Sequence, residues 1–196
     1  METNQNMRRM VVIIPSLKPC HMLLEIISEL KKETFENIVL VDDGSGERYR
    51  EYFQQAQSLY GCHVLTHKSN LGKGSAIKTA MKYVINNQKM QKMDILGIVT
   101  VDGDNQHRAP DVKKVCQKMM ERNDTVILGC RDFNNKNIPW RSRFGNKMTS
   151  RIFYFLCGMK LSDTQTGLRA IPYSLLERMI CVGGGDTNMR QMCYWR

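Results

Sequence analysis

The stretch Val99-Thr-Val-Asp-Gly-Asp-Asn-Gln-His107 (VTVDGDNQH) carries the pattern that decides the fold. A β-branched run, typical of a buried strand, ends abruptly in Asp102 and Asp104, which flank a glycine that lets the backbone turn sharply. Two carboxylates at a strand end can face one hard cation such as Mg²⁺ or Mn²⁺, with Gln106 or His107 as a further ligand or substrate contact. Asp-Gly is also a common turn dipeptide, so the stretch alone favours a turn over a metal site.

On both sides of this stretch, the chain alternates between expected strands and expected helices. Strand patterns lie at 10–15, 37–46, 62–67, 94–104 and 125–131, and helix patterns at 21–33, 47–60, 70–87 and 110–122. This strict alternation predicts an α/β domain with a mostly parallel central sheet and helices on both faces. In such sheets, ligands bind at the carboxyl ends of the strands.

Two more polar segments lie at expected strand ends. Asp42-Asp43-Gly44-Ser45 offers acceptors for a nucleobase or ribose, although Ser45 also fits an N-cap for the next helix. Asn70-Leu-Gly-Lys-Gly74 combines a helix start, backbone N–H groups and Lys73, which together favour an anion. It matches neither the Walker A nor the GxGxxG spacing, and a plain glycine-rich helix start is an equal alternative. The coincidence of three such segments at strand ends is stronger evidence for a site than any one of them.

Length and composition are those of one globular domain. The chain has 196 residues, of which 42% are hydrophobic and 24% charged. Its longest apolar runs, 95–101 and 152–157, are too short to form a membrane-spanning helix, and its first ten residues lack a signal-peptide core. The seven cysteines show no metal-ligand spacing, so we interpret them as reduced packing residues of a cytosolic protein.

Positive charge is concentrated in the last third of the chain. Residues 131–196 hold 11 basic and 4 acidic residues, whereas residues 1–130 hold 18 and 15. This excess suits a phosphate-rich partner or an anionic membrane surface, with plain solubility as the alternative. A nucleic-acid partner is disfavoured, because no binding motif accompanies the charge and the expected strand ends are acidic.

A basic amphipathic helix is expected to begin near Trp140. Arg143, Lys147 and Arg151 recur at helical spacing beside a neighbouring apolar, aromatic and methionine-rich stripe. The pattern fits a helix on a membrane surface and equally a helix that packs on the core with a solvated basic side. The polar segment 162–169 lies between apolar segments, so we expect a loop that lines a site, with Asp163 as an acceptor-orienting group or a base.

With these motifs assembled, the sequence resembles the family 2 glycosyltransferases of the GT-A fold, and within them the dolichol- and bacterial polyprenol-phosphate sugar transferases. The matching pieces follow the family's order: VVIIPSLKP (11–19), VDDGSG (41–46), NLGKGSAIKTA (70–80), VTVDGDNQH (99–107), GCRDF (129–133), IPWRSRFGNK (138–147) and SDTQTGLRAIP (162–172).

The resemblance implies a Rossmann-like GT-A domain that spans residues 1–196. Its nucleotide-sugar part would cover about 8–130 and its acceptor part about 131–180. The implied activity is inverting, metal-dependent transfer of a hexose from a UDP- or GDP-sugar to a polyprenyl phosphate, at the cytoplasmic face of a membrane. A transferase with a saccharide acceptor and a weak or inactive nucleotide-binding remnant are the alternatives, and a homo-oligomer is left open.

The resemblance also implies roles for individual residues. The donor would be bound by Pro15, Asp42, Asp43, Gly72, Lys73, Asp102 and Gly103, and Mg²⁺ or Mn²⁺ by Asp102, Asp104 and Gln106. The acceptor or phosphate groups would be bound by Arg131, Arg141, Ser142, Arg143, Gln165 and Arg169. The implied catalytic residues are Asp102, Asp104 and Asp163, the last as a base or a positioning group, because an acceptor phosphate is already an anionic nucleophile.

Two places depart from the family pattern. Leu17-Lys18-Pro19 stands where many relatives read Tyr-Asn-Glu or Leu-Asn-Pro. The segment 181–196 keeps little of the family's following Gly-Glu/Asp-Arg motif, so we expect a catalytic domain shortened at its C-terminus.

Overall fold

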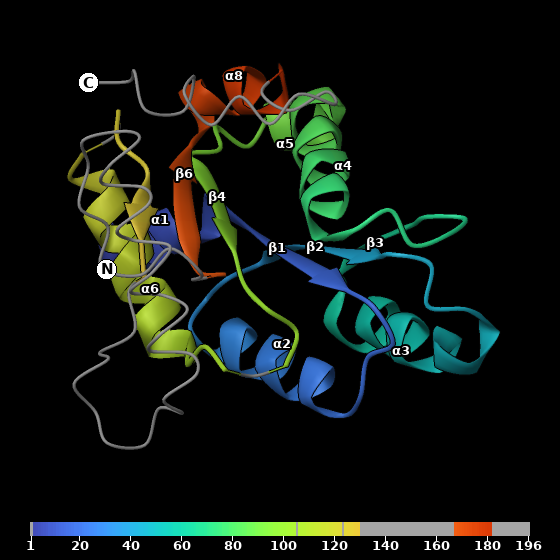
Figure 1. Cartoon of the computed structure of the whole chain (residues 1–196). Helices are drawn as coiled ribbons and strands as arrows, with labels where there is room; N and C mark the ends of the chain where they lie inside the picture. The colour runs from blue at the N-terminus through green and yellow to red at the C-terminus, as the bar shows by residue number, and fades with distance from the viewer. Residues whose placement is uncertain (1, 105, 123, 130–166, 182–196) are drawn as a thin grey trace, which may run out of the picture.

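The computed structural model describes residues 2–104, 106–122, 124–129 and 167–181 (Figure 1). The strands are β1 (Met10–Ser16), β2 (Asn37–Asp42), β3 (His63–Thr66), β4 (Gly97–Thr100), β5 (Ile127–Leu128) and β6 (Arg169–Pro172). The α-helices are α1 (Glu2–Arg8), α2 (Met22–Lys32), α3 (Arg50–Tyr60), α4 (Lys73–Asn86), α5 (Gln88–Gln91), α6 (Ala109–Met120) and α8 (Leu176–Cys181). Short 3-10 turns, η1 (Glu47–Tyr49) and η2 (Tyr173–Leu175), precede α3 and α8.

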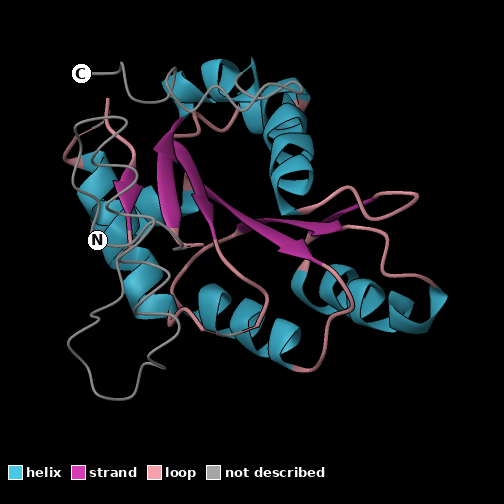
Figure 2. Ribbon diagram, viewed as in Figure 1, coloured by secondary structure: helices cyan, strands magenta, loops and turns pink. Residues whose placement is uncertain are grey.

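The strands form one sheet in the order β3-β2-β1-β4-β6-β5 (Figure 2). β1 is parallel to β2 and β4, and β2 is parallel to β3, whereas β6 runs antiparallel to both of its neighbours. The predicted α/β class with a mostly parallel sheet is therefore confirmed. The antiparallel β6 was not expected, because a four-residue strand is too short for its alternation to be recognised in the sequence.

The register brings the polar segments to one edge of the sheet. Ser16, the last residue of β1, pairs with Asp42, which in turn pairs with Thr66 at the end of β3. Thr100, the last residue of β4, pairs with Arg169, the first residue of β6. The carboxyl ends of the four parallel strands and the amino end of β6 thus lie along the same edge, and the strand order reverses there between β1 and β4. Such a reversal is where open α/β sheets bind ligands.

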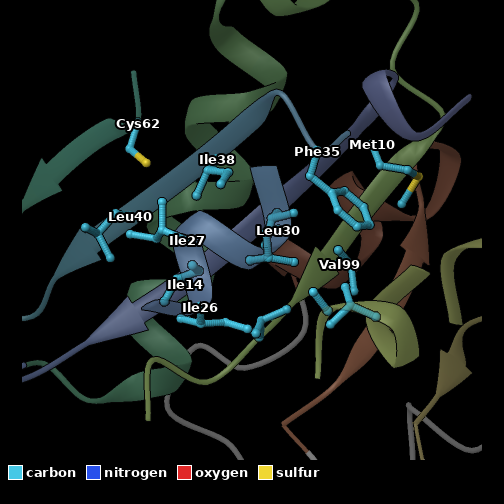
Figure 3. Close-up of a cluster of buried hydrophobic side chains, with 14 of the residues drawn as sticks. Met10, Ile14, Ile26, Ile27, Leu30, Phe35, Ile38, Leu40, Cys62 and Val99 are labelled. Atoms are coloured by element: carbon cyan, nitrogen blue, oxygen red, sulfur yellow. The ribbon is translucent and has the colours of Figure 1, made fainter. Parts of the chain in front are cut away.

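Hydrophobic side chains cover both faces of the sheet, because neighbouring strand residues point to opposite sides. On one face, Met10, Val12 and Ile14 pack against α2, α3 and α6 (Figures 1 and 3). On the other face, Val11 and Ile13 pack against α4 and α8. All five residues are fully buried, and each contributes about 1.5–3 kcal/mol to stability. This two-sided core fixes the strand ends that carry the polar segments.

The element boundaries differ from the expected ones mainly at strand ends. β4 stops at Thr100, so Asp102 and Asp104 lie beyond the strand in a turn. The expected strand at 125–131 is reduced to the two residues of β5, and the expected helix at 47–60 begins with η1.

The structure bears on some of the remaining predictions. In the described ranges, no helix is long and apolar enough to cross a membrane. Cys20, Cys62, Cys116 and Cys181 are free thiols. The basic helix expected near Trp140 and most of the polar segment 162–169 lie outside the described residues; the last residue of that segment belongs to β6, not to a loop.

Candidate active site

The acidic loop after β2 is fastened to the loop after β1. The Asp42 carboxylate accepts a hydrogen bond from the Ser45 N–H (2.8 Å), and the Ser45 hydroxyl accepts one from the Lys18 N–H (2.9 Å). Ser45 therefore does not cap the following helix as the alternative interpretation expected; the N-cap position belongs to Gly46, which has no side chain. Pro15 lies in β1, half-buried and opposite Val41.

Asp43 organises the segment that leads into α4. Its carboxylate accepts hydrogen bonds from the N–H groups of Leu71 (2.9 Å) and Gly72 (2.8 Å) and lies 2.7 Å from His67 Nδ1. The other imidazole nitrogen of His67 lies 2.9 Å from the Thr79 hydroxyl of α4. Only 3% of Asp43 is exposed, so its carboxylate interacts with groups of the protein and not with solvent.

The surroundings of Asp43 favour the charged form of its carboxyl group. Burial raises the pKa of its carboxyl, but the hydrogen bonds from Leu71, His67 and Gly72 outweigh burial and hold that pKa below the ordinary value. The charged carboxylate therefore helps to hold the segment before α4 in place.

Gly44 lets the acidic loop approach this same segment. Its φ is +75°, and a Cβ added there would lie 2.4 Å from the backbone carbonyl carbon of Ser69. A side chain at position 44 would separate the loop after β2 from the segment before α4.

The start of α4 faces the turn after β4. Gly72, with a φ of +89°, is the N-cap of α4, and the ammonium group of Lys73, the first helical residue, forms an ion pair with the Asp102 carboxylate. On the other side of that carboxylate, His107 Nε2 lies 3.6 Å from Asp102 Oδ2. The side chain of Asp102 is 26% exposed and that of Lys73 is 51% exposed, so solvent reaches this pair.

Burial raises the pKa of the Asp102 carboxyl, but His107 and Lys73 beside it outweigh that effect and lower the pKa to about 2. Asp102 is thus a carboxylate at every physiological pH. Among the residues that the structure describes, its partners are the side chains of Lys73 and His107 and not backbone groups.

Asp104 and Gln106 form a second, exposed pair in the same turn. The Gln106 side-chain amide donates to Asp104 (2.6 Å), and the Gln106 N–H lies 3.3 Å from the same carboxylate. Gly103 packs over α2, since a Cβ added there would lie 3.3 Å from the Leu23 side chain. Arg169 reaches this edge as the first residue of β6. The other residues predicted for the acceptor side lie outside the described residues: Arg131, Arg141, Ser142, Arg143, Asp163 and Gln165.

The turn after β4 offers a hard cation two carboxylates, Asp102 and Asp104. His107 Nε2 is buried, has no hydrogen-bond partner among the described residues, and faces Asp102. Although no cluster of three or more His, Cys, Asp or Glu side chains suited to a metal occurs in the part of the chain that the structure describes, Mg²⁺ commonly uses one or two carboxylates and completes its shell with substrate phosphates. The donor set therefore fits a divalent cation that is shared with a diphosphate.

Two residues that contribute to this edge, His67 and Gly167, were not among the predicted site residues. The side chain of His67 is only 8% exposed and connects Asp43 to Thr79. Its position directly after β3, at the same sheet edge as the acidic segments, was a usable signal. Gly167, which contacts Asp102, lies in the polar segment 162–169 that we expected to line a site, but nothing distinguished this glycine from the other residues of the segment.

The family model described as "Glycosyl transferase family 2" matches residues 11–180. The chain belongs to this family. An uncharacterised protein of Methanocaldococcus jannaschii is 34% identical over 89% of this chain and 69% of its own length. A UDP-N-acetylglucosamine–dolichyl-phosphate N-acetylglucosaminyltransferase of Methanococcus voltae is 28% identical over 85% of this chain and 70% of its own.

The fold of this family 2 glycosyltransferase is also found in a solved structure. The crystal structure of S. aureus TarS 1-349 in complex with UDP-GlcNAc aligns with a TM-score of 0.56 at 20% sequence identity. The alignment covers 86% of this chain and 46% of that TarS chain, so the present chain spans about half of it. The GT-A fold expected from the sequence is confirmed.

Proposed function

We propose that this glycosyltransferase moves a hexose from a UDP- or GDP-sugar to a polyprenyl phosphate, with inversion and with Mg²⁺ or Mn²⁺. The observation that carries the proposal is the meeting of three segments at one sheet edge: the acidic loop after β2, the start of α4 and the turn after β4. The name of the M. voltae relative, a dolichyl-phosphate N-acetylglucosaminyltransferase, supports a lipid phosphate as acceptor.

The donor half of the proposal covers residues 8–130. Asp42 and Pro15 would face the nucleoside, while Lys73 and the N–H groups at the start of α4 would bind the diphosphate. Gly72 and Gly103 would let the donor approach the backbone closely. Asp43 contributes by holding the 71–72 segment in place.

Asp102, Asp104 and Gln106 would hold the divalent cation. When bound, the cation would offset the negative charge that develops on the departing nucleoside diphosphate. Lys73, already paired with Asp102, adds a positive charge beside the same position.

The acceptor half of the proposal covers about 131–180. An oxygen of the lipid phosphate attacks the anomeric carbon, a new C–O bond forms, and the bond to the nucleoside diphosphate breaks with inversion. Since the attacking phosphate is already anionic, Asp163 serves as a positioning group or as a base without having to be a strong one. The acceptor phosphate would be bound by Arg131, Arg141, Ser142, Arg143, Gln165 and Arg169.

We place the enzyme on the cytoplasmic face of a membrane, as a peripheral protein. The net charge of +7 on residues 131–196 supports contact with anionic headgroups.

The test is a transfer assay with the full chain. Radiolabelled UDP- and GDP-sugars are incubated with polyprenyl phosphate in vesicles and Mn²⁺, and the product is extracted into organic solvent. We expect label in the organic phase for the wild type. In Asp104→Ala we expect no transferred label and an unchanged melting temperature. A water-soluble glycan product would show that the acceptor is a saccharide and not a lipid phosphate. Nucleotide binding without turnover of any donor would indicate an inactive nucleotide-binding remnant of a transferase.

A further inference from the structure

Gly167 lies against the Asp102 carboxylate. A Cβ added to Gly167 would be 2.2 Å from Asp102 Oδ2 and 2.5 Å from both Cγ and Oδ1. Real Cβ atoms do not approach heavy atoms this closely, so a side chain at position 167 and the present position of the carboxylate exclude each other.

The backbone at this position is fixed from two sides. The Thr100 hydroxyl, in a buried position at the end of β4, donates to the Gly167 carbonyl at 2.6 Å. The next residue, Leu168, accepts a hydrogen bond from the Gly129 N–H at 2.9 Å, and Arg169 pairs with Thr100 in the sheet. A Cβ at position 167 therefore could not move away from Asp102 unless the hydrogen bonds at the start of β6 were broken. The Asp102 carboxylate would have to move instead.

Movement of that carboxylate has a direct consequence. Asp102 is held between the Lys73 ammonium group on one oxygen and His107 Nε2 on the other. Because Oδ2, Cγ and Oδ1 would all be too close to the added Cβ, the side chain would have to rotate about its Cα–Cβ bond. Such a rotation would withdraw it from both partners.

We infer that Gly167 is a positioning residue for Asp102: its bare Cα leaves the space that the carboxylate occupies, and β6 thereby sets where this carboxylate points. Gly167 directly follows the segment proposed to bind the acceptor, so one stretch of chain contributes to both halves of the site. The consequence for ligand binding rests on the proposed function, whereas the contact itself does not.

The first test measures Mn²⁺ binding to the full chain from the electron paramagnetic resonance signal of free Mn²⁺. In Gly167→Ala we expect the dissociation constant to rise about tenfold or more, the loss typical of changes that misplace a metal ligand. Gly97→Ala, at the opposite end of β4, is the control, because its Cβ would meet the Ile171 carbonyl oxygen at 2.4 Å and not Asp102. It should lower the melting temperature without changing Mn²⁺ affinity. Unchanged Mn²⁺ affinity in Gly167→Ala would overturn the inference.

The second test is a double-mutant cycle read by thermal unfolding, which requires neither metal nor donor. Asp102→Ala removes all three atoms that the added Cβ would meet. We expect Gly167→Ala to lower the melting temperature of the wild type, and to lower that of Asp102→Ala by less than half as much. An equal loss in both backgrounds would refute the contact. Failure of the wild type to bind Mn²⁺ would reject the proposed metal site, and the cycle alone would then decide the role of Gly167.

Discussion

Asp43 follows β2 and Asp102 follows β4 at the same sheet edge, yet their surroundings are opposite. Asp43 is 3% exposed and receives two backbone N–H groups and an imidazole. The side chain of Asp102 is 26% exposed and is held by the long, half-exposed side chain of Lys73, with His107 beyond hydrogen-bond distance.

This contrast indicates that the two carboxylates have separate roles: Asp43 stabilises the fold, and Asp102 is available to bind a ligand. The backbone N–H donors cannot leave Asp43 unless the 71–72 segment unfolds, so this carboxylate has a structural role. A lysine side chain can move from Asp102 to a phosphate without disturbing the fold, so this carboxylate can accept a ligand. Exchange of either carboxylate for an amide should therefore have a different result.

Asp102→Asn should reduce sugar transfer on the order of 100-fold or more, because it removes the charge that faces the diphosphate and its cation. The melting temperature should change little, since the partly exposed pair with Lys73 contributes little to stability. Transfer of radiolabel and thermal unfolding are measured on the same preparation. A variant that retains full transfer would remove Asp102 from the site.

Asp43→Asn should cost about 1–3 kcal/mol of unfolding free energy, because an amide cannot accept all the hydrogen bonds that the carboxylate receives. Urea unfolding measures this loss. Asp104→Asn, at an exposed carboxylate in the other segment, is the control and should leave stability nearly unchanged. Equal stability of the two variants would contradict the structural role of Asp43.

The unfolding free energy at acidic pH should depend on the charge of the Asp43 carboxyl group. Its pKa is lowered from 3.8 in the folded protein, so its stabilising contribution is complete above about pH 4 and is lost as the pH falls through the lowered value. Asp43→Asn, which has no such carboxylate, should therefore differ most from the wild type near neutral pH. Below pH 4 the difference should shrink, and urea midpoints between pH 7 and pH 3 measure it. A difference that stays constant over this range would show that the charge of Asp43 is not what stabilises the loop.

Thr79→Val should have the smallest effect, about 1 kcal/mol, because it removes one hydrogen-bond partner of His67 at nearly constant volume. Thr79→Ser, which keeps the hydroxyl, is the matched variant and should retain most of the lost stability. If valine and serine at this position were equally stable, the connection from Asp43 through His67 to α4 would be irrelevant to folding.

The sequence predicted the sheet edge well and the partners of each residue poorly. β-branched runs such as 10–14 and the alternation with helices were enough to place Asp42, Asp43 and Asp102 at strand ends. Nothing in the sequence distinguished Asp43 from Asp42, since burial and hydrogen bonding depend on the path of the loop before α4.

Gly167 shows the same limit more clearly. Its importance arises from the antiparallel β6, which brings residue 167 against residue 102, and a pairing across 65 positions leaves no local pattern. Helix and strand signals are local, whereas the contacts that position a carboxylate are made between distant segments.

The most direct test of the division between Asp43 and Asp102 is calorimetric binding of a UDP- or GDP-sugar with and without Mn²⁺. We predict that Mn²⁺ strengthens binding to the wild type. Asp43→Asn should weaken binding by a similar factor in both conditions, because it acts through the loop. Asp102→Asn should abolish the strengthening by Mn²⁺. A full Mn²⁺ effect in Asp102→Asn, or its selective loss in folded Asp43→Asn, would contradict the account.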